Sequence, residues 1–238
     1  MPRTSALGIV VPHAGYVYSG HVAGEVYSKL ELPNRYIILC PNHTGLGEPL
    51  AIMSSGEWQT PIGNAAIDEE LAECFKAIDP ELREDASAHR LEHALEVQLP
   101  FLQFLEEEKI RFVPVTVGTS DLAALKRLGE AMAHAIQQEA GHTIIIASSD
   151  MNHYESDSVT RVKDQKAIDR MLDLDTEGLY EVVHGEEISM CGFGPATAML
   201  TATKQLGATE AELVKYATSG DIFGERAQVI GYAGLIIS

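Results

Sequence analysis

The sequence predicts a single α/β domain spanning residues 1–238, built as a sandwich with a mostly parallel central β-sheet flanked by helices. Two observations lead to this fold class. Short apolar runs rich in β-branched residues alternate along the chain with longer segments of helical periodicity. No linker, compositional break or internal repeat divides the chain, whose 238 residues are enough to bury one sizeable core.

The expected strands are short and almost entirely apolar, which is typical of strands buried on both faces of a parallel sheet. The first of them, Ile-Val-Val, stops at Pro12. The third leads into glycine-rich turns that indicate a β excursion at a sheet edge. We expect strands at 9–11, 35–40, 50–53, 111–117, 143–147, 212–218 and 228–237.

The expected helices follow from apolar residues that recur every three or four positions. Capping residues support two of the boundaries: Asp68 at the start of the second helix, and Gly194 with Pro195 at the entry of the last one. We expect helices at 19–30, 68–78, 91–107, 121–140, 159–172, 176–183 and 196–206.

Composition and charge narrow the classes of function. A formal net charge of −18, without a basic cluster, disfavours nucleic acid as a partner. No apolar run is long enough to span a membrane, and the first residues lack the pattern of a signal peptide, so we expect a cytoplasmic protein that does not bind membranes. The three cysteines are widely spaced, which argues against a disulfide scaffold and a structural zinc site.

Three histidines follow buried strands: His13, His43 and His153. Each taken alone could be a structural histidine bonded to a loop. Because the carboxyl ends of parallel strands meet at one edge of the sheet, however, we expect the three to converge. Converging neutral imidazoles are good ligands for iron, copper or zinc. Five other histidines are expected to be ordinary surface residues: His21, His89, His134, His142 and His184.

A divalent cation also favours an anionic ligand, and three residues are candidates: Asp150, Glu96 and Cys191. Cys191 precedes a predicted helix start, so the helix dipole and a metal together are expected to lower the pKa of its thiol. The alternative is that Cys191 is simply a small buried hydrophobic residue.

His93 and Glu96 are three residues apart in the predicted helix over 91–107, which places both on one face. Such pairs are common on solvated helices. Here apolar neighbours bound the same face, so we expect the pair to enter a crevice, with His93 acting in proton transfer or supporting a ligand.

Five motifs in this order resemble the Memo family, whose bacterial and archaeal members are called AmmeMemoRadiSam system protein B. Together they extend over nearly the whole chain. The motifs are Pro-His-Ala-Gly-Tyr at 12–16, Pro-Asn-His at 41–43, Glu-His-Ala-Leu-Glu-Val-Gln-Leu-Pro at 92–100, Ser-Ser-Asp-Met-Asn-His-Tyr at 148–154 and Cys-Gly at 191–192.

The resemblance implies a fold like that of the class III extradiol dioxygenases, which use non-haem ferrous iron. It implies metal ligands at His13, His43 and Cys191. A cysteine replaces the glutamate of those dioxygenases, which favours iron or copper and redox chemistry over ring cleavage. The resemblance also places three more residues in the same pocket: His93, Asp150 and His153.

Two further implications concern the surroundings of this domain. Memo-like proteins usually carry an additional amino-terminal segment with an Ala-Gly-x-Phe-Tyr-Pro-like motif, which is absent from this sequence. The family name implies a pathway shared with radical-SAM and AMMECR-type proteins.

The leading hypothesis is a metal-dependent oxidoreductase that acts on an unknown small molecule. In it, His153 or His93 moves a proton and Asp150 orients one of them. The first alternative is a non-catalytic module that binds a phosphorylated or acidic peptide or a partner protein. The second is a zinc hydrolase in which Glu96 or Asp150 acts as the base.

Overall fold

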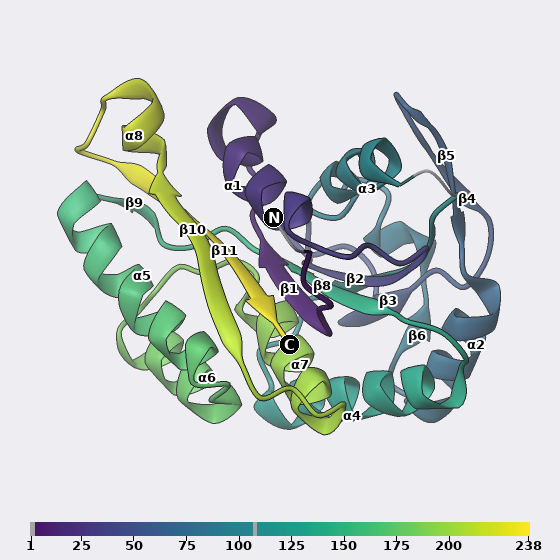
Figure 1. Ribbon diagram of the computed structural model, residues 1–238. Helices are drawn as coiled ribbons and strands as arrows, with labels where there is room; N and C mark the ends of the chain where they lie inside the picture. Colours follow the sequence, from purple (N-terminus) through teal and green to yellow (C-terminus); the bar gives the residue numbers. More distant parts are fainter. Residues whose placement is uncertain (1–2, 107–108) are drawn as a thin grey trace.

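The computed structural model describes residues 3–106 and 109–238, and one β-sheet runs through its centre (Figure 1). The described part of the chain contributes eleven strands to this sheet. They are β1 (Gly8–Val11), β2 (Arg35–Pro41), β3 (Leu50–Ile52), β4 (Glu57–Thr60), β5 (Gly63–Ile67), β6 (Arg83–Glu84), β7 (Arg111–Val117), β8 (Ile144–Ser148), β9 (His153–Glu155), β10 (Ala211–Thr218) and β11 (Val229–Ile237).

Helices cover the sheet on both sides. They are α1 (Tyr16–Ser28), α2 (Glu69–Ile78), α3 (Leu99–Leu105), α4 (Leu122–Gln138), α5 (Asp157–Leu172), α6 (Thr176–Gly185), α7 (Phe193–Gln205), α8 (Ser219–Phe223) and the 3₁₀ helices η1 (Ala86–Ala88) and η2 (Glu96–Gln98). Figure 1 shows α1 and α3 on one face of the sheet and α4 and α7 on the other. The sequence therefore predicted the fold class correctly: a single-domain α/β fold with a mostly parallel sheet between helices.

The order of the strands determines where the candidate site forms. The main path of the sheet is β10-β11-β1-β8-β2-β7-β3-β6, and its four central strands, β1, β8, β2 and β7, are parallel. The flanking strands β11 and β3 are antiparallel to them. Every residue of β1, β2 and β8 is buried, as expected for parallel strands covered on both faces. The segments that follow these three strands therefore meet at one edge.

Most element boundaries agree with the predicted ones to within a few residues. Asp68 caps α2 as expected, because its side chain accepts a hydrogen bond from the backbone N–H of Leu71. Helix α1 begins three residues earlier than predicted, directly after the turn at Gly15. The short elements β9 and α8 were not predicted, since three and five residues carry too little periodicity.

The helix predicted over 91–107 is wrong in its first part. Residues 91–95 form turns, followed by η2 and then α3; the predicted end at 107 lies outside the described residues. The backbone of the turns is engaged elsewhere, which explains the difference. The N–H of Ala94 donates to the side chain of Glu92, and its carbonyl accepts from the hydroxyl of Ser148.

Within residues 3–106 and 109–238, no helix combines the length and the apolar character that crossing a bilayer requires.

Candidate metal centre

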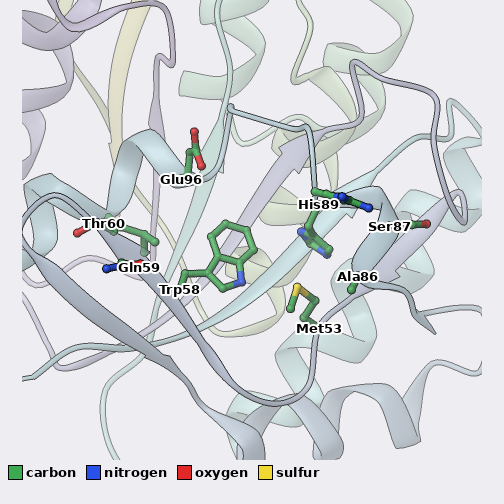
Figure 2. Close-up of a pocket in the computed structure, with 10 residues that line it drawn as sticks. Met53, Trp58, Gln59, Thr60, Ala86, Ser87, His89 and Glu96 are labelled. Atoms are coloured by element: carbon green, nitrogen blue, oxygen red, sulfur yellow. The ribbon is translucent and has the colours of Figure 1, made fainter.

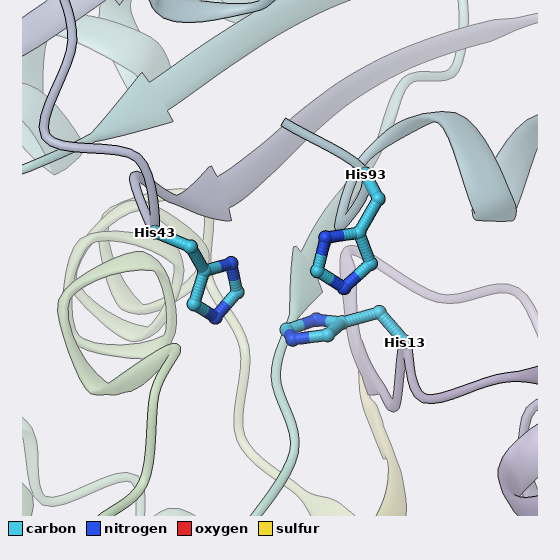
Figure 3. A group of neighbouring side chains, drawn as sticks. All are labelled: His13, His43 and His93. Carbon is cyan, nitrogen blue, oxygen red and sulfur yellow. The ribbon is translucent and has the colours of Figure 1, made fainter. Parts of the chain in front are cut away.

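Three histidines meet at the carboxyl edge of the parallel strands (Figure 3). His13 follows β1, His43 follows β2, and His93 lies in the turns before η2. One ring nitrogen from each falls in a group whose members all lie within 4.8 Å of one another. The ring centroids are 5.3 Å apart for His13 and His43, 5.7 Å for His13 and His93, and 5.3 Å for His43 and His93. This spacing could hold one metal ion.

The hydrogen bonds around His13 determine which of its ring nitrogens is available. The hydroxyl of Ser148 donates its only proton to the carbonyl of Ala94 (2.6 Å) and accepts a hydrogen bond from Nε2 of Gln98 (2.9 Å). Nδ1 of His13 lies 3.0 Å from the same hydroxyl oxygen, so this nitrogen must be the donor. The lone pair on Nε2 is therefore free to bind a ligand.

Burial also keeps His13 neutral. Its exposed fraction is 3%, and burial lowers the pKa of His13 to about 4, with a further decrease from the nearby His43 and His93. A neutral imidazole with a free Nε2 lone pair is the form that binds transition metals.

Glu92 orients His43. One carboxylate oxygen accepts a hydrogen bond from Nδ1 of His43 (2.9 Å), and the other accepts from the backbone N–H of the same residue (2.7 Å). Burial alone would raise the pKa of Glu92, but these hydrogen bonds and one from Ala94 lower it to about 2. Because the ionised carboxylate fixes the proton on Nδ1, the Nε2 of His43 is left as the coordinating atom. Such carboxylate–histidine pairs commonly support metal sites.

Glu92 was not among the residues singled out from the sequence. The predicted helix over 91–107 gave no reason to expect a buried carboxylate, whereas the turns bury the Glu92 side chain to 1% exposure. Its position directly before His93 was the signal available in the sequence.

The structure separates His93 from Glu96. The His93 side chain is 57% exposed, and its ring stacks on His43 at an interplanar angle of 22°. Glu96 instead lines a different pocket together with Trp58 (Figure 2). The prediction that both side chains enter one crevice is therefore wrong, because it depended on a helix that does not form. Glu96 is not positioned to serve as an anionic ligand or as a base at the histidines.

Cys191 lies beside His13. Its Sγ is 3.3 Å from Nε2 of His13 and accepts a hydrogen bond from the backbone N–H of Asp150 (3.3 Å). The following residue must be glycine, since a Cβ at Gly192 would lie 2.4 Å from the carbonyl oxygen of Ser148. The protein surroundings by themselves act against the lowering of the thiol pKa that was expected from the helix dipole together with a metal. Burial, together with the charge of Asp150, raises the pKa of Cys191, so the free thiol is neutral at pH 7.

Asp150 holds the loop that carries His13. Its Oδ1 accepts hydrogen bonds from the backbone N–H groups of His13 (2.8 Å) and Ala14 (3.2 Å). The sequence predicted that Asp150 orients the ring of His93 or His153. In the structure, Asp150 instead binds the backbone of the loop that carries His13.

His153 also lines this pocket. Its Nδ1 donates to the carbonyl of Ser189 (2.8 Å), which leaves Nε2 as an acceptor. The next residue, Tyr154, is mostly exposed and has a φ of 61°, a conformation rare for non-glycine residues. The cavity has a volume of about 520 Å³. All six residues that the resemblance placed in this pocket line it: His13, His43, His93, Asp150, His153 and Cys191.

Replacing Glu92 with glutamine is expected to weaken metal binding by about 10- to 100-fold, because the neutral amide no longer fixes the proton of His43 as the carboxylate does. Isothermal titration of the purified variant with metal ions would measure this loss. Glu81→Gln is the matched control, since Glu81 is exposed and lines a different pocket from the histidines. Equal affinity of the Glu92 variant and the wild type would contradict the role of Glu92.

The segment carrying His153 is coupled to a buried carboxyl group. Asp164 accepts hydrogen bonds from the backbone N–H of Asn152 (2.8 Å) and from the hydroxyl of Tyr216 (2.6 Å). Burial raises the pKa of Asp164 to about 7, although both hydrogen bonds oppose this. The folded state thus holds this proton more tightly than the unfolded chain does, so the contribution of Asp164 to stability decreases from about pH 4 to pH 7.

Asp164→Asn is therefore expected to gain about 1–3 kcal/mol in unfolding free energy relative to the wild type over this interval. Comparing the two proteins isolates the contribution of Asp164 to the pH dependence. The buried His13 and His89 have lowered pKa values and act in the opposite direction, but they do so in both proteins, so their effect cancels in the difference. Urea unfolding at several pH values measures the difference. A difference that does not change with pH would contradict the raised pKa.

The fold and the site together define a class: an α/β protein whose parallel strands carry a histidine-rich cluster at their carboxyl edge, suited to hold a metal ion. The chain belongs to the Memo family, because the family model described as "Memo-like protein" matches residues 1–236. This confirms the resemblance inferred from the five motifs.

Two similar proteins carry the same family name. MEMO1 family protein MK0963 of Methanopyrus kandleri is 44% identical over 96% of this chain and 82% of its own length. The MEMO1 family protein of Caldivirga maquilingensis is 43% identical, covering 98% of this chain and 83% of that protein. A crystal structure of uncharacterized protein JW3007 from Escherichia coli K12 superposes with a TM-score of 0.65 at 12% identity, covering 96% of this chain and 98% of that one, which supports the fold alone.

Proposed function

We propose that this protein is a metal-dependent oxidoreductase whose iron or copper ion is held by His13, His43 and His93, with the thiolate of Cys191 as a further ligand beside His13. The observation that carries the proposal is the set of directed lone pairs. Nε2 of His13 and Nε2 of His43 are both freed by hydrogen bonds at the opposite ring nitrogen.

The spacing of His13 and Cys191 is compatible with such an ion. A nitrogen and a sulfur bound to one tetrahedral metal at the usual lengths lie roughly 3.5 Å apart. Nε2 of His13 and Sγ of Cys191 are separated by 3.3 Å, so both can bind one ion with little movement. Binding a metal also deprotonates a coordinating thiol, which overcomes the raised pKa of Cys191. The combination of imidazole and thiolate suits iron, copper and zinc, and of these iron and copper are redox-active.

When bound, a redox-active ion supplies electron transfer to or from a small substrate or oxygen. The residues of the chain supply the rest. His153 lines the same cavity and donates through Nδ1 to Ser189, so its Nε2 is the ring nitrogen that can accept a proton from a substrate. Ser189 fixes that tautomer, and Asp150 keeps His13 in position through the backbone.

The test is metal analysis of protein purified without oxygen or chelator, compared with Cys191→Ser. We expect near-stoichiometric iron or copper in the wild type and a loss of affinity of about tenfold or more in the serine variant. An unchanged metal content in Cys191→Ser would show that the thiolate is not a metal ligand. A stoichiometric content of zinc alone would contradict the redox proposal and favour a hydrolase.

His93→Ala tests whether His93 is a metal ligand or only transfers protons. If His93 binds the ion, its alanine variant loses metal affinity to a similar extent as Cys191→Ser. If His93 only moves protons, the variant retains the metal and loses turnover, which would overturn its assignment as a ligand. His134→Ala, an exposed histidine on α4, is the matched control.

A further inference from the structure

A second pocket lies next to the metal centre along the chain. Residues 86–99 contribute to two separate cavities: His93 lines the one with the histidine cluster, whereas His89, Arg90 and Glu96 line the other. This second cavity, which we call the Trp58 pocket, has a volume of about 530 Å³ (Figure 2). That volume is in the usual range for a small-molecule site.

A flat aromatic surface forms one wall of the Trp58 pocket. The half-buried indole of Trp58 packs edge-to-face against Phe112, with centroids 5.4 Å apart and an interplanar angle of 81°. It also packs edge-to-face against His89, at 5.7 Å and 71°. These contacts hold the indole in place, and Met53 adds a polarizable thioether beside it. Such a wall suits a planar ring in an offset-stacked or edge-on arrangement.

Two opposite charges line the same pocket without partners. Within the described residues, the side chains of Arg90 and Glu96 form no ion pair and no hydrogen bond, and both residues are exposed. Figure 2 shows Glu96, Trp58 and His89 around the same pocket, which Arg90 also lines. The pocket therefore offers both a cation and a carboxylate beside its aromatic wall.

His89 adds an unsatisfied polar group. The sequence placed it among the surface histidines, but the structure buries it to 5% exposure. Neither ring nitrogen has a hydrogen-bond partner of regular geometry among the described residues, although the backbone of Ala51 lies close to the ring. An unsatisfied buried polar group is costly and is commonly completed by water or a ligand.

We propose that the Trp58 pocket binds a small zwitterionic aromatic compound, with its ring on Trp58, its carboxylate at Arg90 and its ammonium group at Glu96. Each unpaired charge of the protein then gains a partner. The two charges of the ligand cancel, so the net charge of −18 does not repel it as it would repel an anion. The inference is independent of any metal at the histidine cluster.

Tryptophan fluorescence reads this pocket selectively, because Trp58 is the only tryptophan of the chain. The probe is 4-(aminomethyl)benzoate, with benzoate and benzylamine as analogues that each lack one charge. Titration, with excitation at wavelengths that only tryptophan absorbs, is expected to give a saturable change with the zwitterion. We expect binding about tenfold weaker with either analogue.

Variants assign the two charges. Arg90→Gln and Glu96→Gln are each expected to weaken binding of the zwitterion about tenfold. Arg83→Gln, which removes another exposed arginine without an ion pair in the described chain and outside this pocket, should bind like the wild type. Thermal melting verifies that all three variants fold.

Three results would overturn the proposal: no saturable change in the wild type, equal affinity for benzoate or benzylamine, or unchanged binding in Arg90→Gln and Glu96→Gln.

Discussion

Replacing His13 with alanine is expected to reduce metal affinity at least 100-fold while leaving the fold intact. His13 is the most buried of the three histidines, and its Nε2 lies next to Cys191. Removing it eliminates one ligand and the imidazole that lies 3.3 Å from the thiol sulfur. The fold is retained, because Asp150 binds the backbone of residue 13 and not its ring.

Metal titration and thermal unfolding of the same preparation measure both parts of this prediction. The loss of a buried ring is expected to decrease the unfolding free energy by about 1–3 kcal/mol, through the cavity left behind and the hydrogen bond that Ser148 no longer accepts. A His13→Ala variant with wild-type metal affinity would refute the site. The His134→Ala control should retain both metal and stability.

Replacing Arg35 with methionine is expected to decrease the unfolding free energy by about 3–5 kcal/mol, since it leaves a buried carboxylate without its main partner. Nε of Arg35 donates to Asp68 at 2.7 Å, and the two side chains are 7% and 1% exposed. Asp68 also caps α2, so its position affects the start of that helix. Arg111 lies 3.6 Å from the same carboxylate and offsets part of the loss.

Urea unfolding measures the effect, with Lys29→Met as control. Lys29 pairs with Glu212 at 2.9 Å, but the side chains are 31% and 58% exposed, so its removal should cost under about 1 kcal/mol. Similar losses in both variants would contradict the importance of burial for the Arg35–Asp68 pair.

The fold could be predicted from the sequence because its central strands are buried on both faces. Strands β2 and β7 are mostly apolar after an initial arginine, and their predicted boundaries are correct to within a residue. The segment 91–98 could not be predicted in the same way. Its apolar spacing is helical, yet contacts of Glu92 and Ala94 with residues distant in the sequence satisfy the backbone differently. Tertiary hydrogen bonds of this kind leave no periodic signal.

The candidate site, too, could be predicted from the sequence only in part. His13, His43 and His153 were identified because parallel strands bring their carboxyl ends to one edge. The histidine cluster also contains His93, which the sequence assigned to proton transfer or to the support of a ligand. The role of Glu92 and the direction of the Cys191 pKa depend on burial, which strand order alone does not reveal.

The central claim is that one metal ion lies between the three histidines. Anomalous X-ray diffraction from crystals of the metal-loaded protein, recorded at the absorption edge of the bound metal, tests it most directly. We predict a single strong peak about 2.0–2.3 Å from Nε2 of His13, Nε2 of His43, a ring nitrogen of His93 and Sγ of Cys191. A peak elsewhere, or none at this cluster in protein shown to contain metal, would contradict the account.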